Sequence, residues 1–244
     1  LYGYCIQIYC DFSGYSDMAI GIALLLGFKI PMNFNAPLTA DSMTDFWRRW
    51  HISLSTWIRD YVYISLGGNK KGTLRMYFNQ MVAMTACGLW HGASLNFIVW
   101  GVLHGALVCV HKFWSQTVLK HDRRYHPSGL RRFISVFITF HVLCFTWLFF
   151  RCKDFDAVWV MVKQMFTKFN PSVLPDVFMG YKYVFLLMIF ALLTHWIPDS
   201  WQNRCVRILE KGGVLLSAIA ITIVIFIIMQ VKSSDIQPFI YFQF

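Results

Sequence analysis

The chain has 244 residues, of which 57% are apolar and only 14% are charged. This balance excludes a water-soluble globular domain, because too little polar surface is available to cover the fold. The formal net charge of +10 would suit a nucleic-acid-binding protein, but the basic residues lie in short connections between apolar segments and form no continuous stripe. We therefore expect an all-α, multi-pass integral membrane protein that contacts lipid and has no nucleic-acid partner.

Apolar segments that could cross a bilayer recur along the whole chain. The strongest candidates are 183–196 with its flanks and 212–231, and the shorter or more polar candidates are 2–28, 78–110 and 133–150. A hydrocarbon core of about 30 Å needs about 20 residues per span, so the pattern predicts about five or six crossings.

Two carboxylates interrupt the first apolar segment. Asp11 and Asp17 lie between apolar neighbours, and a charged side chain at mid-membrane costs about 2.5–3.5 kcal/mol on insertion scales. That cost implies a partner or a water-filled cavity. Either each aspartate pairs with an arginine of the next segment, or it takes a direct part in chemistry.

The segment 29–71 is expected to be a loop that leads into a helix over 42–64. Ser42-x-x-Asp45 resembles a capping box at the start of this helix. Apolar residues then recur every three or four positions, at Trp47, Trp50, Leu54, Trp57 and Tyr61. Polar residues lie on another face, at Arg48, Ser55 and Arg59. This pattern favours an interfacial or re-entrant helix buried within protein, ending at the turn Leu66-Gly67-Gly68-Asn69.

The segment 77–114 is too long for one helix, and Gly88-Leu-Trp-His-Gly92 supplies a place for a break. We expect two helical pieces with His91 at their junction. An interrupted helix at membrane depth frees backbone amides and leaves room for a polar substrate.

An imidazole is the usual general base for a hydroxyl, and the chain has eight histidines. Five are set aside because they lie in or beside a basic loop, or in apolar spans without polar neighbours: His111, His121, His126, His141 and His195. Each of the other three, His51, His91 and His104, is by itself more often a hydrogen-bonded core residue than a catalyst. The flanking glycines and the helix break favour His91.

Other kinds of site find no support in the sequence. The seven cysteines include no Cys-x-x-Cys pair, and most lie in apolar segments, so they are interpreted as small core residues. Nucleophile-elbow, phosphate-loop and dinucleotide motifs are absent from the sequence. We expect no bound metal and no permanently bound cofactor.

Several ordered motifs together resemble the membrane-bound O-acyltransferase family. They are Asp11-Phe-Ser-Gly-Tyr-Ser-Asp17, Asn33-Phe-Asn-Ala-Pro37, Asp45-Phe-Trp-Arg-Arg-Trp-His-Ile-Ser-Leu-Ser55, Arg59-Asp-Tyr61, Leu66-Gly-Gly-Asn69 and Gly88-Leu-Trp-His-Gly92. The resemblance is greatest to the branch of the alginate O-acetylation membrane protein, which is related to the teichoic acid D-alanyl transferase. It covers the chain through about Gly105; the later spans match only in hydropathy.

The resemblance implies a helical bundle around a central tunnel in the inner membrane of a bacterium. His91 takes the position of the catalytic histidine and His51 that of a second family histidine, whose role is to orient His91, to bind the donor side of the tunnel or to hold the aromatic helix in place. The activity implied is transfer of acetyl, or a similar small acyl group, from a cytoplasmic thioester such as acetyl-CoA toward an extracytoplasmic glycan. Polar and aromatic residues of the motifs and their neighbours are candidates to line the tunnel or bind the donor: Asp11, Asp17, Arg48, Arg49, Trp50, Arg59, Asp60, Trp90, Asn96 and His104.

Membrane orientation follows from the basic connections. The segments 112–132 and 204–211 are rich in lysine and arginine and are placed in the cytoplasm, whereas 151–182 also carries three aspartates and is placed outside. The tail after Val231 then lies outside. We interpret 1–244 as one membrane domain, with a motif-bearing core at 1–110 and carboxy-terminal helices at 111–244. Because Leu1 begins inside an apolar run, we expect a fragment that lacks amino-terminal spans.

The chain ends on Phe239-Ile-Tyr-Phe-Gln-Phe244. Such a segment can anchor a protein at the membrane interface. It is also similar to the terminal motif of the small membrane peptide that accompanies D-alanyl transferases, which implies that Tyr241 carries the acyl group to a partner glycan transferase outside the membrane.

Two other function classes remain open. A transporter would use the broken helix and the intramembrane charges as a substrate path, but should show a second copy of the broken segment, and the sequence has no such repeat. A scaffold that recruits an extracytoplasmic transferase would need no histidine at membrane depth.

Overall fold

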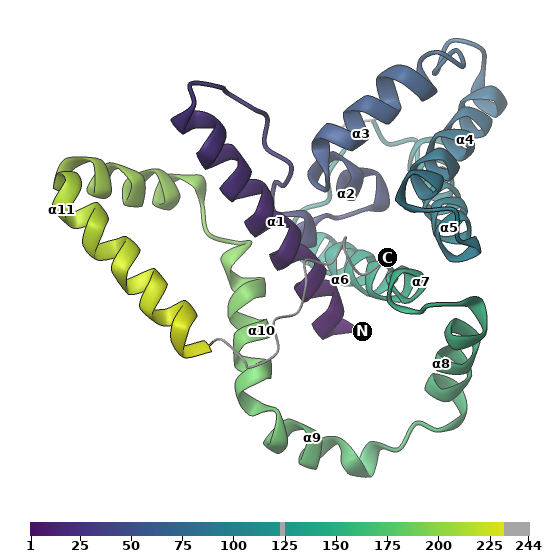
Figure 1. Cartoon of the computed structure of the whole chain (residues 1–244). Coiled ribbons are helices and arrows are strands. Elements are labelled where there is room, and N and C mark those ends of the chain that lie inside the picture. Colours follow the sequence, from purple (N-terminus) through teal and green to yellow (C-terminus); the bar gives the residue numbers. More distant parts are fainter. Residues whose placement is uncertain (123–124, 232–244) are drawn as a thin grey trace. The chain divides into compact units, whose positions relative to one another are not determined.

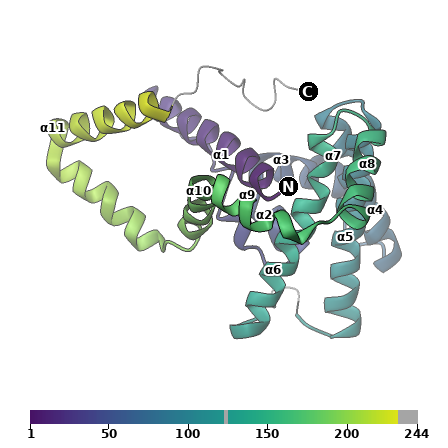
Figure 2. The ribbon, with the colours of Figure 1, turned by 90° about the horizontal axis from the view of Figure 1, so that it is seen from below.

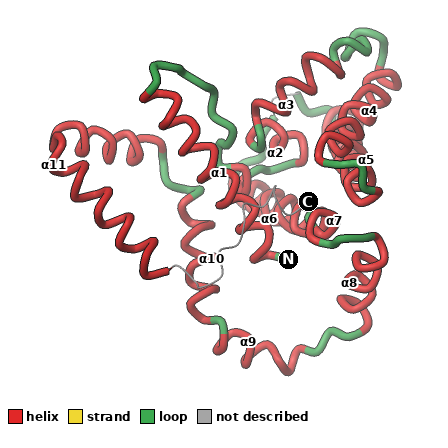
Figure 3. The backbone as a smooth tube through the Cα atoms, in the orientation of Figure 1, coloured by secondary structure: helices red, strands yellow, loops and turns green. Residues whose placement is uncertain are grey.

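The computed structural model describes residues 1–122 and 125–231, and every regular element in these ranges is helical, as Figure 3 shows. This confirms the predicted all-α class. Two compact units are described separately, Leu1–His195 and, within the described residues, 196–231.

The first part of the chain consists of a long helix, a loop and two short helices. Helix α1 (Tyr2–Leu25) is followed by a loop with the 3-10 turn η1 (Pro37–Thr39) and by α2 (Met43–Arg49) and α3 (Ile52–Ile58). A π-helical turn η2 (Arg59–Tyr63) ends this region. Helices α4 (Thr73–His91) and α5 (Leu95–Lys112) come next, with the π-helical turn η3 (Phe113–Val118) at the end of α5 (Figure 1).

The second part of the first unit begins with α6 (Gly129–Thr146) and the short α7 (Leu148–Arg151). It continues through α8 (Phe155–Thr167), η4 (Pro171–Val173), α9 (Leu174–Gly180) and α10 (Lys182–Thr194). The second unit contains α11 (Asp199–Val231), which is interrupted by a non-helical residue at Gly213.

Helices α4 and α5 pack side by side (Figure 2). Their backbones approach closely at Gly88 and Gly101, where an added Cβ would lie 2.3 Å from the carbonyl oxygen of Phe97 and 2.5 Å from that of Met84. Small residues at such a contact let two helices pack closely. In a membrane this van der Waals packing drives helix association, because the hydrophobic effect does not act between helices in lipid. The two pieces predicted for 77–114 are confirmed, with the break at the predicted glycine motif.

The single helix expected over 42–64 is corrected to two helices separated at Trp50 and His51. The predicted cap is confirmed in part: the backbone N–H of Asp45 donates to Ser42 Oγ over 3.2 Å, but the Asp45 carboxylate accepts from the backbone N–H of Asp41, not of Ser42. The expected apolar face is buried only in its first half, because Trp57 is 51% exposed and Tyr61 is 67% exposed.

Three described helical segments are long and apolar enough to cross a membrane: Leu95–Val118, Gly129–Arg151 and Ser200–Gln230. A bent pair formed by Pro171–Gly180 and Lys182–Thr194 raises the number to four. This is fewer than the five or six crossings expected from the sequence, because the polar residues of α1 and α4 keep both helices outside that set.

Candidate active site

His91 lies at the end of α4, where the chain leaves the helix at Gly92. Its half-buried ring is surrounded by aromatic rings from α4 and α5, which form a helical hairpin, and from α7. The ring centroids of Trp90, Trp100 and Phe150 lie 4.9, 5.4 and 5.0 Å from that of His91. The helix break therefore presents this imidazole inside an aromatic enclosure.

His51 lies at a second helix break, between α2 and α3. Its backbone is left-handed, with φ 45°, a conformation that costs an ordinary residue about 1–2 kcal/mol. The preceding loop satisfies backbone groups at this break: the Asn35 N–H donates to the Arg49 carbonyl and the Ile52 N–H donates to the Asn33 carbonyl, each over 3.0 Å. The loop after α1 thus supports the orientation of the buried His51 ring.

One exposed indole connects the two histidines. The Trp90 ring centroid lies 5.8 Å from that of His51 and 4.9 Å from that of His91, and Trp90 is 54% exposed. Phe12 of α1 covers His51 from another side, with 4.7 Å between ring centroids. The structure therefore places the two histidines predicted from the sequence around the same space.

His104 has a different environment. It is fully buried, and its Nδ1 accepts a hydrogen bond from the Trp47 indole N–H over 3.2 Å. Its Nε2 donates to Thr146 Oγ1 over 2.9 Å, and that hydroxyl donates to the Leu143 carbonyl. Because an indole N–H only donates, the tautomer is fixed and both ring nitrogens are used. His104 is thus a structural link between α2, α5 and α6.

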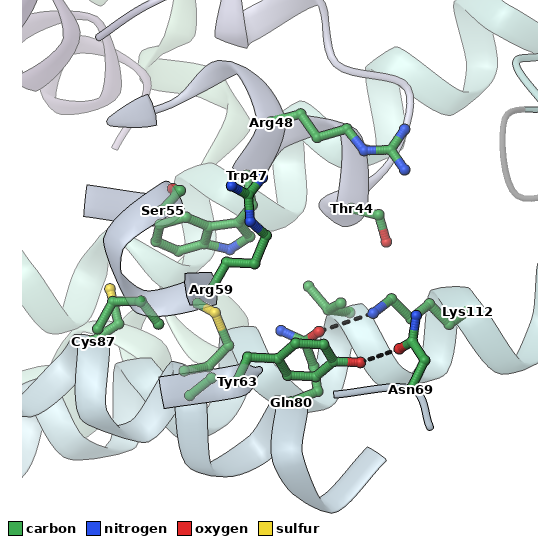
Figure 4. A pocket seen from close by; sticks show the side chains of 14 residues that line it. Thr44, Trp47, Arg48, Ser55, Arg59, Tyr63, Asn69, Gln80, Cys87 and Lys112 are labelled. Carbon is green, nitrogen blue, oxygen red and sulfur yellow. Dashed lines mark hydrogen bonds between the residues drawn. The ribbon is translucent and has the colours of Figure 1, made fainter. Parts of the chain in front are cut away.

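A pocket of about 350 Å³ lies beside this link (Figure 4). It is lined by residues of α2, α3, η2, the following turn, α4 and α5: Thr44, Trp47, Arg48, Ser55, Ile58, Arg59, Tyr63, Asn69, Gln80, Ala83, Met84, Cys87, Val108 and Lys112. Lys112 and Gln80 were not predicted as site residues; both line the pocket, and Lys112 Nζ donates to Gln80 Oε1 over 2.8 Å. The sequence feature that could have pointed to Lys112 is its place in the last turn of an apolar helix.

The α4 wall of the pocket forms one row of side chains. Gln80, Met84 and Cys87 are spaced four and three residues apart, which places them on one helix face. His91, four residues after Cys87, continues the same row. Along α4 the distance from Gln80 to His91 is about 16 Å. The pocket lining therefore runs along α4 from Gln80, beside Lys112, to Cys87, one turn before His91, which does not line it.

Two arginines predicted to bind the donor have carboxylate neighbours. Arg49 Nε lies 2.8 Å from Asp45 Oδ2, and Arg59 Nε lies 2.7 Å from Asp60 Oδ1. The hydrogen bond from Arg59 lowers the pKa of Asp60. Arg48 lines the pocket and forms no ion pair with any described residue.

The other predicted tunnel residues are dispersed. Asp11 is partly buried and Asp17 is exposed, and neither forms the expected ion pair within the described chain. Trp50 is core, and Asn96 is buried with its side-chain amide donating to the Cys152 carbonyl over 2.9 Å. Tyr241, together with the terminal motif, lies outside the described residues.

His126, one of the five histidines set aside as candidate bases, has acidic neighbours. His126 Nδ1 lies 2.6 Å from Asp41 Oδ2, and Asp45 completes a set of three groups that could hold a metal ion. Arg49 already neutralises Asp45. We infer no metal site from this group.

These features define a class: a multi-pass helical membrane protein with two histidines at helix breaks and a partly basic pocket whose lining ends one helical turn before one of them. The sequence profile of the membrane-bound O-acyltransferase family matches residues 1–151, beyond the motifs recognised in the sequence and up to the end of α7. The chain belongs to this family.

Relatives support the same branch. The chain is 46% identical over 164 residues to a probable alginate O-acetylase of Azotobacter vinelandii, covering 67% of this chain and 31% of that protein. It is 34% identical over 260 aligned positions to a probable alginate O-acetylase of Pseudomonas putida, covering 99% of this chain and 52% of the relative. A peptidoglycan O-acetyltransferase of Helicobacter pylori is 43% identical over 162 residues, covering 66% and 30%. The chain thus spans about a third to a half of these relatives.

Proposed function

We propose that this chain carries the acyl-transfer site of a membrane-bound O-acyltransferase in the bacterial inner membrane. The protein transfers acetyl, or a similarly small acyl group, from a cytoplasmic thioester such as acetyl-CoA toward an extracytoplasmic polysaccharide or cell-wall glycan. The observation that carries the proposal is the row of pocket residues on α4 that continues to His91.

His91 acts as the general base. Its neutral imidazole accepts the proton of the acceptor hydroxyl while that oxygen attacks the acyl carbonyl carbon. The carbon–sulfur bond then breaks, and the thiolate that leaves takes the proton from the imidazolium. The buried rings of Trp100 and Phe150 shield this exchange from bulk water.

The donor's phosphates fit the basic end of the pocket. Arg48, Arg59 and Lys112 line it, and guanidinium and ammonium groups form strong charge-assisted hydrogen bonds with phosphate. Arg48 is the most available of the three, since Arg59 pairs with Asp60 and Lys112 donates to Gln80. The orientation that places 112–132 in the cytoplasm puts this end where a cytoplasmic thioester enters.

Transfer to the glycan is completed outside the membrane by a partner transferase, with Tyr241 as the acyl carrier between the two sites. The phenolic oxygen of Tyr241 would be the hydroxyl that His91 deprotonates, giving a phenolic ester that the partner then uses. Interfacial anchoring by the terminal aromatic residues is the alternative role.

The test compares His91→Ala with His141→Ala in the full-length protein. His141 lies in α6, its Nδ1 donates to the Phe137 carbonyl of the same helix over 2.8 Å, and it does not line the pocket. We expect His91→Ala to abolish O-acetylation of surface glycan, measured by mass analysis, at parental abundance in the membrane. His141→Ala should retain it. Full acetylation in cells that carry His91→Ala would overturn the assignment.

A further inference from the structure

The side chain of Asn33 is placed where it controls the His51 ring. Asn33 Oδ1 lies 3.4 Å from His51 Nδ1, 3.2 Å from the backbone nitrogen of Ser53 and 2.6 Å from Ser53 Oγ. All three contacts converge on one atom of the asparagine amide. This atom therefore sits between the left-handed His51 and the first turn of α3.

The Ser53 contact fixes the chemistry of that atom. A backbone N–H can only donate, so the atom facing Ser53 is the amide oxygen, and the Asn33 amide has one orientation. An amide oxygen can only accept, so the partner nitrogen, His51 Nδ1, carries the hydrogen. In the neutral ring, Nε2 is then the nitrogen with a free lone pair.

His51 Nε2 is buried and has no hydrogen-bond partner among the described residues. A buried acceptor without a donor is destabilising, and so is the left-handed backbone of the same residue, with φ 45°. Two unfavourable features on one residue beside the candidate base indicate a function. Trp90, which is exposed, borders both His51 and His91.

We propose that Asn33 is a positioning residue that fixes His51 in the tautomer whose Nε2 accepts a hydrogen bond from the substrate at the His91 site. The proposal rests on the acyl-transfer function. The group that donates is an N–H of the substrate, an amide of the thioester's arm, because the single hydrogen of the acceptor hydroxyl goes to His91. In this tautomer Nε2 accepts a hydrogen bond. In the other neutral tautomer Nε2 would carry the hydrogen and could only donate.

The test uses the full-length protein in native membrane vesicles, with radiolabelled acetyl-CoA and the glycan that the vesicles carry. Transfer rates are divided by the amount of protein in the membrane. Asn33→Leu removes the acceptor, and Asn33→Asp keeps an oxygen in its place. Ser53→Ala removes only the hydroxyl contact, and Asn35→Leu changes an exposed neighbour in the same loop.

We expect Asn33→Leu to lower kcat/KM about tenfold, which corresponds to about 1.4 kcal/mol. Asn33→Asp, Ser53→Ala and Asn35→Leu should stay within about threefold of the parent, because Nδ1 keeps its acceptor. A higher KM for acetyl-CoA would assign Nε2 to the thioester's arm. A lower kcat at unchanged KM would overturn the assignment of Nε2 to the thioester's arm.

A parental rate in Asn33→Leu, or an equal loss in Asn33→Asp, would overturn the inference while leaving acyl transfer established. Absence of transfer by the parent protein from acetyl-CoA and from other acyl thioesters would overturn the proposed function and this inference together.

Discussion

Replacing Gly88 by alanine tests the close approach of α4 and α5. The new Cβ would lie 2.3 Å from the Phe97 carbonyl oxygen, which belongs to the backbone of α5 and cannot rotate away. The helices must separate by about 0.7 Å or more to restore an acceptable contact. Overpacking of this kind costs about 1–3 kcal/mol, and alanine returns up to about 1 kcal/mol through its better helix propensity. Because the contact is with backbone, the upper part of that cost applies, about 2–3 kcal/mol, and the net loss is about 1–2 kcal/mol.

The measurement is the midpoint of thermal unfolding in detergent. We expect Gly88→Ala to lower it by about 2–8 °C. Acetyl transfer should also fall, because Gly88 lies in the turn before His91, the proposed general base, and small displacements of such a group are costly. Gly21→Ala in α1 is the matched control, since its Cβ would meet nothing within 4 Å. If Gly88→Ala is as stable as Gly21→Ala, the close approach is not a constraint and the reasoning fails.

Three further predictions concern the core, the orientation and the chain end. His104→Leu leaves the indole N–H of α2 without its acceptor and should lower unfolding stability by about 1–3 kcal/mol, so a parental thermal midpoint would contradict the structural role. In a protein whose native cysteines are replaced, a cysteine at Ser128 should resist an impermeant thiol reagent in intact cells and one at Ser172 should react; the reverse labelling would invert the orientation. Tyr241→Phe keeps the aromatic ring and deletes the hydroxyl, so it should abolish glycan acetylation if Tyr241 carries the acyl group, whereas unchanged acetylation would leave the terminal segment as an anchor.

The sequence was sufficient for the helical class and for the broken hairpin around His91. Long apolar segments specify helices in a membrane, and the glycines at 88 and 92 mark the place where one of them ends. Both signals are local in sequence. The resemblance to a family added the expectation that His91 and His51 belong to one site, and the rings around Trp90 bring them to the same space.

The break at His51 was not predictable from propensity. Histidine rarely adopts a left-handed backbone, and the apolar spacing runs across the break without interruption. The break is permitted by tertiary contacts. The loop at Asn33 and Asn35, which precedes α2, supplies hydrogen-bond partners for the backbone at the break. His104 could not be separated from the candidate catalysts for the same reason, since Thr146, which satisfies Nε2, lies 42 positions later.

The chain of hydrogen bonds through His104 also bears on how the protein enters the membrane. Helix α5 emerges during synthesis with an imidazole whose two nitrogens need Trp47 from an earlier helix and Thr146 from a later one. Lipid offers neither partner, so α5 alone would expose unsatisfied polar atoms to hydrocarbon. We therefore expect the insertion machinery to hold α5 beside α2 until α6 has been translated, so that α5 and α6 pass into the bilayer together.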